Sequence, residues 1–144
     1  MNAWPPLLFA GIRVLHLAPD WSEARVALRL RRWNRNYVGT QFGGSLFAMT
    51  DPFWMLLMMH RLGRDYIVWD RAAEIRFVSP GRGDVFARFV LDDERVAKVR
   101  AEAGAGRVLE WFEVEVTTAS GEVVAVVRKQ LYVKRKERPR AGVH

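Results

Sequence analysis

Residues 34–60, NRNYVGTQFGGSLFAMTDPFWMLLMMH, decide the fold of this chain. The stretch begins as a polar loop, passes the adjacent glycines Gly43 and Gly44, and becomes the most apolar run of the sequence. One carboxylate, Asp51, lies inside that run. An ionised carboxylate among Phe, Leu, Met and Trp is costly to bury unless it is hydrogen-bonded, paired or in contact with water. Asp51 is therefore the first candidate functional residue.

The apolar run predicts a buried helix over about residues 44–60. Apolar side chains on all sides are typical of a helix that the rest of a protein covers. The run is interrupted by Asp51 and Pro52 and is shorter than the roughly 20 residues of a membrane span. In a continuous helix, Asp51 would lie on the same face as Gly44 and about 10 Å further along the axis.

The Asp51-Pro52 pair has a second interpretation. Asp is a good N-cap and Pro a good first helical residue, so a helix can begin at Pro52 with Asp51 as its cap. A proline inside a longer helix removes one hydrogen bond and kinks the helix. Local signals alone leave both interpretations open.

The residues before the helix point to carbonyl chemistry. A helix N-terminus carries unpaired N–H groups and a partial positive charge, and glycines there let a substrate oxygen approach the backbone. Together with the amide side chains of the loop and the carboxylate of Asp51, such a site could polarise a carbonyl and activate water.

Composition limits the alternatives. At 144 residues, half of them hydrophobic and 27% charged, the chain is expected to form one globular domain with a real core. The sequence has no cysteine, which excludes disulfides, thiolate catalysis and cysteine-based zinc sites. His16, His60 and His144 are too scattered to suggest a metal site. The N-terminus lacks the basic and apolar regions of a signal sequence, so a cytoplasmic protein is expected.

The formal net charge of +7 is concentrated near the C-terminus. We expect a single domain over residues 1–133, followed by a basic tail over residues 134–144. A basic tail can bind nucleic acid through phosphates, but this tail has no interleaved aromatic residues for base stacking. A solvated terminus is therefore favoured over a nucleic-acid role, and the excess charge of the body favours an acidic ligand.

Alternation of apolar and polar residues predicts strands in the remainder of the chain. A helix with apolar residues at helical spacing is expected from Asp92 to residue 103. The order is then two strands, the apolar helix, two strands, the second helix and two strands, which favours an antiparallel sheet with one covered face. The expected strands cover residues 12–17, 23–32, 66–69 with 73–78, 85–91, 107–118 and 122–134.

This arrangement resembles the hotdog fold of acyl-CoA thioesterases and dehydratases. The resemblance is closest to the PaaI-like thioesterases and to an uncharacterised thioesterase-like family related to them. Those enzymes carry Asn, five residues, His-Gly-Gly, six residues and then Asp. Here Asn36, Phe42-Gly43-Gly44 and Asp51 stand at the same spacing. The resemblance implies an α+β hotdog fold, with an antiparallel sheet of five to six strands wrapped around a helix at about 44–60 that contains Asp51.

The resemblance also implies roles for these residues. Asp51 would be the general base or the nucleophile that acts on a thioester carbonyl. The N–H of Gly44, with that of Gly43, would hold the oxyanion, and Asn36 would position the attacking water or the carbonyl. Coenzyme A would enter as part of the substrate, and no separate cofactor or metal is expected. The enzyme would be a homodimer or a dimer of dimers, with Asp51 facing a loop of the partner subunit.

The sequence departs from the family pattern at Phe42, which stands where the family has His. Thr40 or Gln41 could replace the missing hydrogen-bonding group. This departure leaves room for a protein that binds acyl-CoA or fatty acid without hydrolysis. A hydratase or dehydratase of the same fold is disfavoured because no His accompanies the carboxylate.

Other candidate residues have a structural alternative. Met55 and Met58 could line an acyl tunnel or fill the core. Asp70 is expected to pair with Arg71 or Arg76 rather than to act in catalysis. Three arginines could contact the phosphates of coenzyme A or lie on a solvated surface: Arg76, Arg82 and Arg107.

Overall fold

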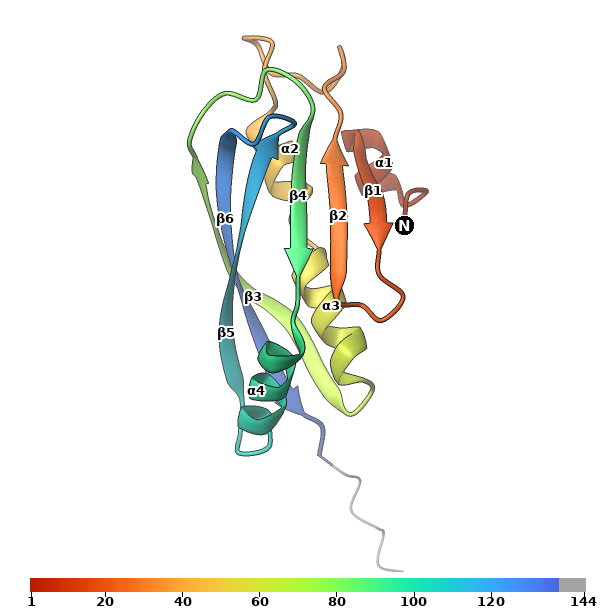
Figure 1. Ribbon diagram of the computed structural model, residues 1–144, viewed down its shortest axis with the longest axis vertical. Coiled ribbons are helices and arrows are strands. Elements are labelled where there is room, and N and C mark those ends of the chain that lie inside the picture. The colour runs from red at the N-terminus through yellow and green to blue at the C-terminus, as the bar shows by residue number, and fades with distance from the viewer. Residues whose placement is uncertain (138–144) are drawn as a thin grey trace, which may run out of the picture.

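The computed structural model describes residues 1–137 and is built on one six-stranded antiparallel sheet (Figure 1). The strand order across the sheet is β1-β2-β4-β5-β6-β3, so β1 and β3 are its edges. The strands are β1 (Ile12–Leu17), β2 (Glu23–Leu28), β3 (Tyr66–Phe77), β4 (Val85–Val90), β5 (Val108–Thr118) and β6 (Val123–Arg135).

Strand β3 does not pair with β4, which follows it in the chain, but with β6. The two β-prone segments expected at 66–69 and 73–78 form this one long strand. Its pairing with β6 is irregular between Asp70 and Ala72. This bulge shifts the alternation of the side chains, so that Val68 before it and Ile75 after it both pack against the core.

The predicted central helix is present but is broken at residues 49–52 into α2 (Gly43–Ala48) and α3 (Phe53–Leu62). Pro52 has no N–H to donate, and its ring disfavours helical geometry at the preceding residue. The backbone N–H of Asp51 instead donates to the carbonyl of Ala48 at 3.2 Å, which closes a tight turn. Figure 1 shows α2 and α3 following one another along the concave side of the sheet.

Because of this break, neither position expected for Asp51 is correct, inside a continuous helix or as the N-cap of a helix that begins at Pro52. Asp51 lies in the turn between the helices, not inside a helix. It is not an N-cap either, because the N-cap of α3 is Pro52 and no side chain caps that end.

The core lies between α3 and the sheet. Phe53 and Leu57 are fully buried, and the ring of Trp54 packs between Phe89 (5.3 Å between centroids) and Phe112 (4.9 Å). The expected second helix is α4 (Asp93–Ala103), where the carboxylate of Asp92 accepts from the N–H of Arg95 at 2.7 Å. A short N-terminal helix, α1 (Pro5–Ala10), lies beside β1.

Strand β6 continues beyond the expected domain boundary. Lys134 and Arg135, assigned above to the basic tail, pair with Ile67 and Tyr66 of β3. Residues 138–144 of the tail lie outside the described residues. Among residues 1–137, no helix has the length and apolar character needed to cross a membrane.

Glu23, the first residue of β2, forms ion pairs with Arg25 and Arg88. These pairs make the stability of the fold depend on pH. A hydrogen bond from Arg88 at 2.8 Å, with a second from Arg25 at 2.5 Å, lowers the pKa of Glu23 from 4.5 to about 2. The pairs therefore stabilise the fold above pH 4.5, and this stabilisation is lost as the pH falls towards 2.

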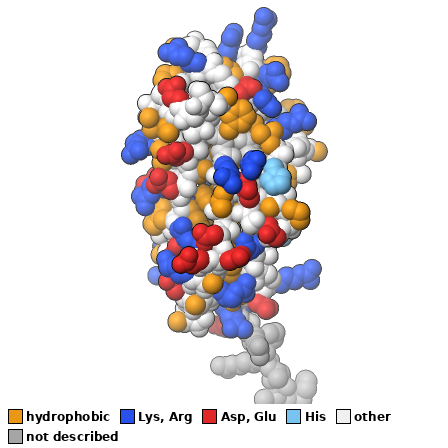
Figure 2. All heavy atoms as spheres, in the orientation of Figure 1, with side chains coloured by type: hydrophobic (Ala, Val, Ile, Leu, Met, Phe, Trp, Pro, Cys, Tyr) orange, Lys and Arg blue, Asp and Glu red, His pale blue; other side chains and the backbone are white. Residues whose placement is uncertain are grey.

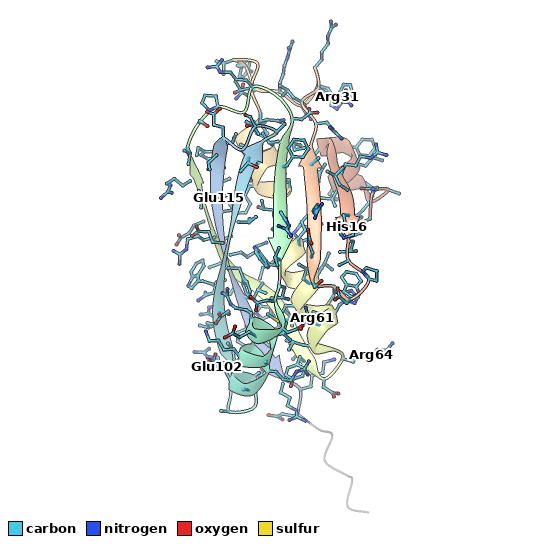
Figure 3. The ribbon with its side chains drawn as sticks, viewed as in Figure 1. His16, Arg31, Arg61, Arg64, Glu102 and Glu115 are labelled. Atoms are coloured by element: carbon cyan, nitrogen blue, oxygen red, sulfur yellow. The ribbon has the colours of Figure 1, made fainter. Side chains whose placement is uncertain are left out.

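We predict that Glu23→Gln lowers the free energy of unfolding at pH 7 and that its difference from the wild type shrinks towards pH 2–3, as measured by urea denaturation across this range. Glu102→Gln on α4 (Figure 3) is the control and should show no such trend. A difference for Glu23→Gln that is the same at every pH would contradict the assignment.

Candidate functional site

The loop that leads into α2 is organised by Asn36. Its Oδ1 accepts from the N–H groups of Val38 at 3.1 Å and Thr40 at 3.0 Å, and its Nδ2 donates to the Thr40 hydroxyl at 2.8 Å and, weakly, to the Gln41 carbonyl at 3.4 Å. Asn side chains commonly hold turns in this way. The sequence predicted that Asn36 positions a substrate or water, whereas in this structure both of its polar atoms have partners within its own loop.

Gln41 joins this loop to the β3–β4 connection. Its side chain is buried, and Nε2 donates to the carbonyls of Leu28 at 3.2 Å and Gly83 at 3.0 Å. Its backbone N–H donates to the carbonyl of Gly81 at 2.8 Å. Gly81 has no room for a side chain, because a Cβ there would lie 2.8 Å from the Gln41 Cγ. Within residues 1–137 the buried Oε1 of Gln41 has no hydrogen-bond partner.

The two glycines at the start of α2 each lie under an aromatic ring. A Cβ on Gly44 would lie 2.7 Å from the ring of Phe42, and a Cβ on Gly43 would lie 3.0 Å from the ring of Phe77. The first turn of α2 is closed by the N–H groups of Ser45 and Leu46, which donate to the Phe42 carbonyl. No residue in the described part of the chain accepts a hydrogen bond from the N–H of Gly43 or Gly44.

A pocket of about 400 Å³ opens beside this turn. It brings together four residues of the predicted site, and its other walls are mostly apolar. The lining residues are Asn36, Thr40, Gln41, Gly43, Leu46, Phe77, Val78, Ser79, Pro80 and Gly81.

Asp51 is absent from the lining of this pocket and forms a separate cluster. Its side chain is 57% exposed, and its Oδ1 accepts from the Nζ of Lys129 at 2.8 Å. Lys129 also donates to the backbone carbonyl of Asp51 and, at 3.1 Å, to the Oδ2 of Asp70. The Lys129 side chain is only 2% exposed, so a buried ammonium holds one largely exposed carboxylate, that of Asp51, and one mostly buried carboxylate, that of Asp70.

Asp70 was expected to pair with Arg71 or Arg76, and this expectation is wrong. Asp70 is the last residue before the bulge in β3, and its carboxylate pairs with Lys129. Burial raises the pKa of the Asp70 carboxyl, the ammonium of Lys129 opposes this rise, and the nearby Asp51 adds to it.

Lys129 was missed in the sequence analysis, although the sequence carries a signal for it. Along β6, Val127, Lys129, Leu131 and Val133 alternate on the buried face of the sheet. A lysine in the core-facing register of a central strand is costly unless a partner is present. The register alone therefore indicates a buried carboxylate or carbonyl partner, without saying which one.

Within one chain, the two parts of the predicted site, the Gly43–Gly44 turn with its pocket and the Asp51 carboxylate, lie apart. Asp51 is seven positions after Gly44 in a largely helical segment, which corresponds to about 10 Å. Met58 is fully buried in the core, while Met55 is partly buried and packs against it. Neither methionine lines the pocket. Among residues 1–137, no cluster of three or more His, Asp or Glu is placed to hold a metal ion.

Comparison with solved structures defines the class of fold. The chain matches PA5026 of Pseudomonas aeruginosa, a protein of unknown function called a probable thioesterase, with 24% identity over 90% of this chain and 87% of that one and a TM-score of 0.81. It matches a mutant of the phenylacetic acid degradation protein PaaI of Thermus thermophilus with 26% identity over 89% of this chain and 97% of that one, and a TM-score of 0.60. It matches the thioesterase HI1161 of Haemophilus influenzae with 14% identity over 96% of this chain and 89% of that one, and a TM-score of 0.69. The fold is the hotdog fold, as the sequence predicted.

Residues 1–133 match the family described as "Domain of unknown function (DUF4442)", and the chain belongs to that family. A search among curated proteins finds no match to this chain.

The role of Asn36 within its loop generates a prediction. Asn36→Ala removes the hydrogen bonds that both atoms of the amide make inside the loop. We predict a loss of about 1–2 kcal/mol in the free energy of unfolding, measured by urea denaturation. Asn36→Asp keeps the acceptor oxygen and should lose less. Equal stability of Asn36→Ala and the wild type would show that the loop does not depend on this side chain.

Proposed function

We propose that this protein is an acyl-CoA thioesterase that uses Asp51 to assist hydrolysis. The observation that carries the proposal is the solvent-facing carboxylate of Asp51, held at a break in the central helix of a hotdog fold. Its spacing from Gly43-Gly44 and Asn36 is that of the PaaI-like thioesterases. The proteins named as thioesterases among the solved structures support the same class of reaction.

In the proposed reaction, Asp51 takes a proton from water as the water oxygen attacks the thioester carbonyl carbon. The unpaired N–H groups of Gly43 and Gly44 stabilise the negative charge on the carbonyl oxygen. The carbon–sulfur bond then breaks, and the proton passes to the departing thiolate. The products are a carboxylic acid and the free thiol of coenzyme A. Coenzyme A takes part as substrate, and the proposal needs no additional cofactor.

The reaction requires two copies of the chain. A reacting carbonyl must lie about 3 Å from both the water held by the base and the oxyanion donors, whereas Asp51 does not line the pocket beside the glycines and the helical rise of seven positions corresponds to about 10 Å. Strand β3, with Asp70 on it, has one unpaired edge. Pairing of two β3 edges would join two sheets, with Asp51 of one subunit facing the Gly43–Gly44 turn of its partner. We therefore propose a homodimer, alone or within a dimer of dimers, as the active unit.

A second pocket supports an acyl-CoA as the substrate. It has a volume of about 360 Å³ and is lined by Arg32, Arg35, Asn36, Tyr37 and Phe42. Asn36 lines this pocket and the first one, so a substrate that spans both would pass the start of α2.

The chemistry of the second pocket suits the nucleotide end of coenzyme A. Guanidinium groups bind phosphates through paired hydrogen bonds. Within residues 1–137 neither Arg32 nor Arg35 forms a salt bridge, and Tyr37 is fully exposed, which leaves its ring open to stack on a base. Basic side chains project from this end of the molecule, where Arg31 is labelled (Figures 2 and 3). Of the arginines singled out in the sequence, Arg82 lines a different pocket with Arg29 and Asp84.

A binding protein without hydrolytic activity is the second candidate function. The observation that favours it is Phe42, which stands where the PaaI-like enzymes have His. Phe42 is 55% exposed and its ring lies over Gly44, so this residue offers no side-chain hydrogen bond beside the proposed oxyanion site. Such a protein would hold acyl-CoA in the same two pockets.

We predict that Asp51→Asn, a near-isosteric change that removes the base, lowers turnover about 100-fold or more. The measurement is the release of free thiol from a panel of short, long and aromatic acyl-CoAs. Asp65→Asn, in the exposed connection between α3 and β3, is the matched control and should keep full activity.

Full turnover by Asp51→Asn would exclude Asp51 as the base. Saturable binding of acyl-CoA by the wild type without any turnover would favour the binding protein.

We also predict that Arg32→Gln with Arg35→Gln raises KM for acyl-CoA about 10-fold or more, with little change in kcat, because charge-assisted contacts to phosphates are lost. Acyl thioesters of N-acetylcysteamine, which carry no phosphate, should be hydrolysed equally by the variant and the wild type. Arg64→Gln, at the opposite end of the molecule (Figure 3), is the control. An unchanged KM for acyl-CoA would place the phosphates elsewhere.

A further inference from the structure

We infer that Lys129 is a positioning residue for the proposed base: its buried ammonium holds the Asp51 carboxylate in its reactive orientation, and Asp70 holds the ammonium. This inference rests on the proposed thioesterase function and deepens it. The three residues come from three separate elements, namely the α2–α3 turn, β3 and β6.

The place of Lys129 in the sheet is unusual for a lysine. Its neighbours on the same face of β6, Val127 and Leu131, are completely buried. A lysine is almost never fully buried unless it is paired. An apolar side chain would fill the same position without the cost of desolvating an ammonium. Packing alone therefore does not account for a lysine here.

All three donors of the ammonium have an acceptor. Lys129 bonds to the Oδ1 of Asp51 at 2.8 Å, to the Oδ2 of Asp70 at 3.1 Å and to the backbone carbonyl of Asp51. An ammonium has three N–H groups, so its hydrogen-bonding capacity is fully used. The three hydrogen bonds fix the positions of the ammonium and of the two carboxylates relative to one another.

The break in the helix makes the second contact to Asp51 possible. In a continuous helix, the carbonyl of Asp51 would accept from the N–H of Met55. In the described residues the helical ladder resumes with Leu56 donating to Pro52, and the Asp51 carbonyl accepts from Lys129. Asp51 is thus held at its backbone and at one carboxylate oxygen, which restricts the rotation of its side chain. Its second oxygen, Oδ2, is left without a protein partner among residues 1–137.

This geometry suits a base that must meet water in one orientation. Correct placement of a catalytic group contributes strongly to rate, and misplacement by about 1 Å can cost about 100-fold. Asp70 completes the arrangement from the edge strand, because without it the ammonium would lose one of its three acceptors. The raised pKa of Asp70 is consistent with a carboxyl that is partly withdrawn from water to make this contact.

The test compares kcat and KM for thiol release in Lys129→Met, Asp51→Asn and the double variant, with each rate corrected for the folded fraction. We expect Lys129→Met to lower kcat about 10-fold or more while KM changes less than about threefold. The double variant should be no slower than Asp51→Asn alone, because both changes disable the same unit. Lys98→Met, which breaks the ion pair between the exposed Lys98 on α4 and the buried Glu110 on β5, is the matched control and should keep kcat.

Asp70→Asn provides a second variant should Lys129→Met fail to fold. It retains Lys129 and a side chain of the same shape, and it is expected to lower kcat several-fold with KM unchanged.

The outcomes separate this inference from the proposed function. If Asp51→Asn loses turnover while Lys129→Met and Asp70→Asn keep the kcat of the wild type, Lys129 has a purely structural role and the inference is overturned. Losses that multiply in the double variant would overturn it as well. If Asp51→Asn itself keeps full turnover, the proposed use of Asp51 fails first and removes the basis of the inference.

Discussion

The proposed role of Asp51 depends on the contacts that the buried ammonium of Lys129 makes with Asp51 and Asp70. The ammonium lies among the buried apolar side chains of β6, and it meets the helical segment at the break between α2 and α3, where the backbone leaves helical geometry. Pro52 opens that place by withholding an N–H. The turn then presents a carboxylate to solvent while its backbone carbonyl stays bonded. The buried ammonium of Lys129 and the backbone carbonyl of Asp51, which the helix break leaves without a helical donor, therefore form a hydrogen bond with each other.

The same turn determines how far the proposed base lies from the proposed oxyanion site. The helix α2 separates the Gly43–Gly44 turn from Asp51, and the pocket beside the glycines does not reach the carboxylate. In the proposed reaction, a single chain would therefore carry the base and the oxyanion donors too far apart to act on one carbonyl. Strand β3, an edge of the sheet, carries Asp70, and Lys129 links Asp70 to Asp51; the proposed dimer would pair this edge with the same edge of a second chain.

The loop before α2 combines rigidity with an exposed aromatic and basic surface. The amide of Asn36 ties the loop together, and the amide of Gln41 holds it against β2 and the β3–β4 connection. Tyr37 and Phe42 remain exposed beside arginine side chains. A loop built in this way can hold a large anionic ligand without being ordered by it, which reduces the entropic cost of binding. The ring of Phe42 over Gly44 marks the point where this chain differs from the PaaI-like pattern.

The sequence by itself determined the order of the elements, the buried helix and the residues around its start. These features depend on local rules: strand alternation, helical spacing, turn-forming glycines and the effect of proline on its neighbours. The spacing of Asn36, Gly43-Gly44 and Asp51 was likewise readable, and it led to the hotdog fold. Only the tertiary structure decided that β3 pairs with β6, that Asp51 lies in a turn and that Asp70 binds Lys129 instead of a neighbouring arginine. Lys129 and Asp51 are 78 residues apart in the chain, and a contact over that distance follows from sheet order and register, which no local pattern encodes.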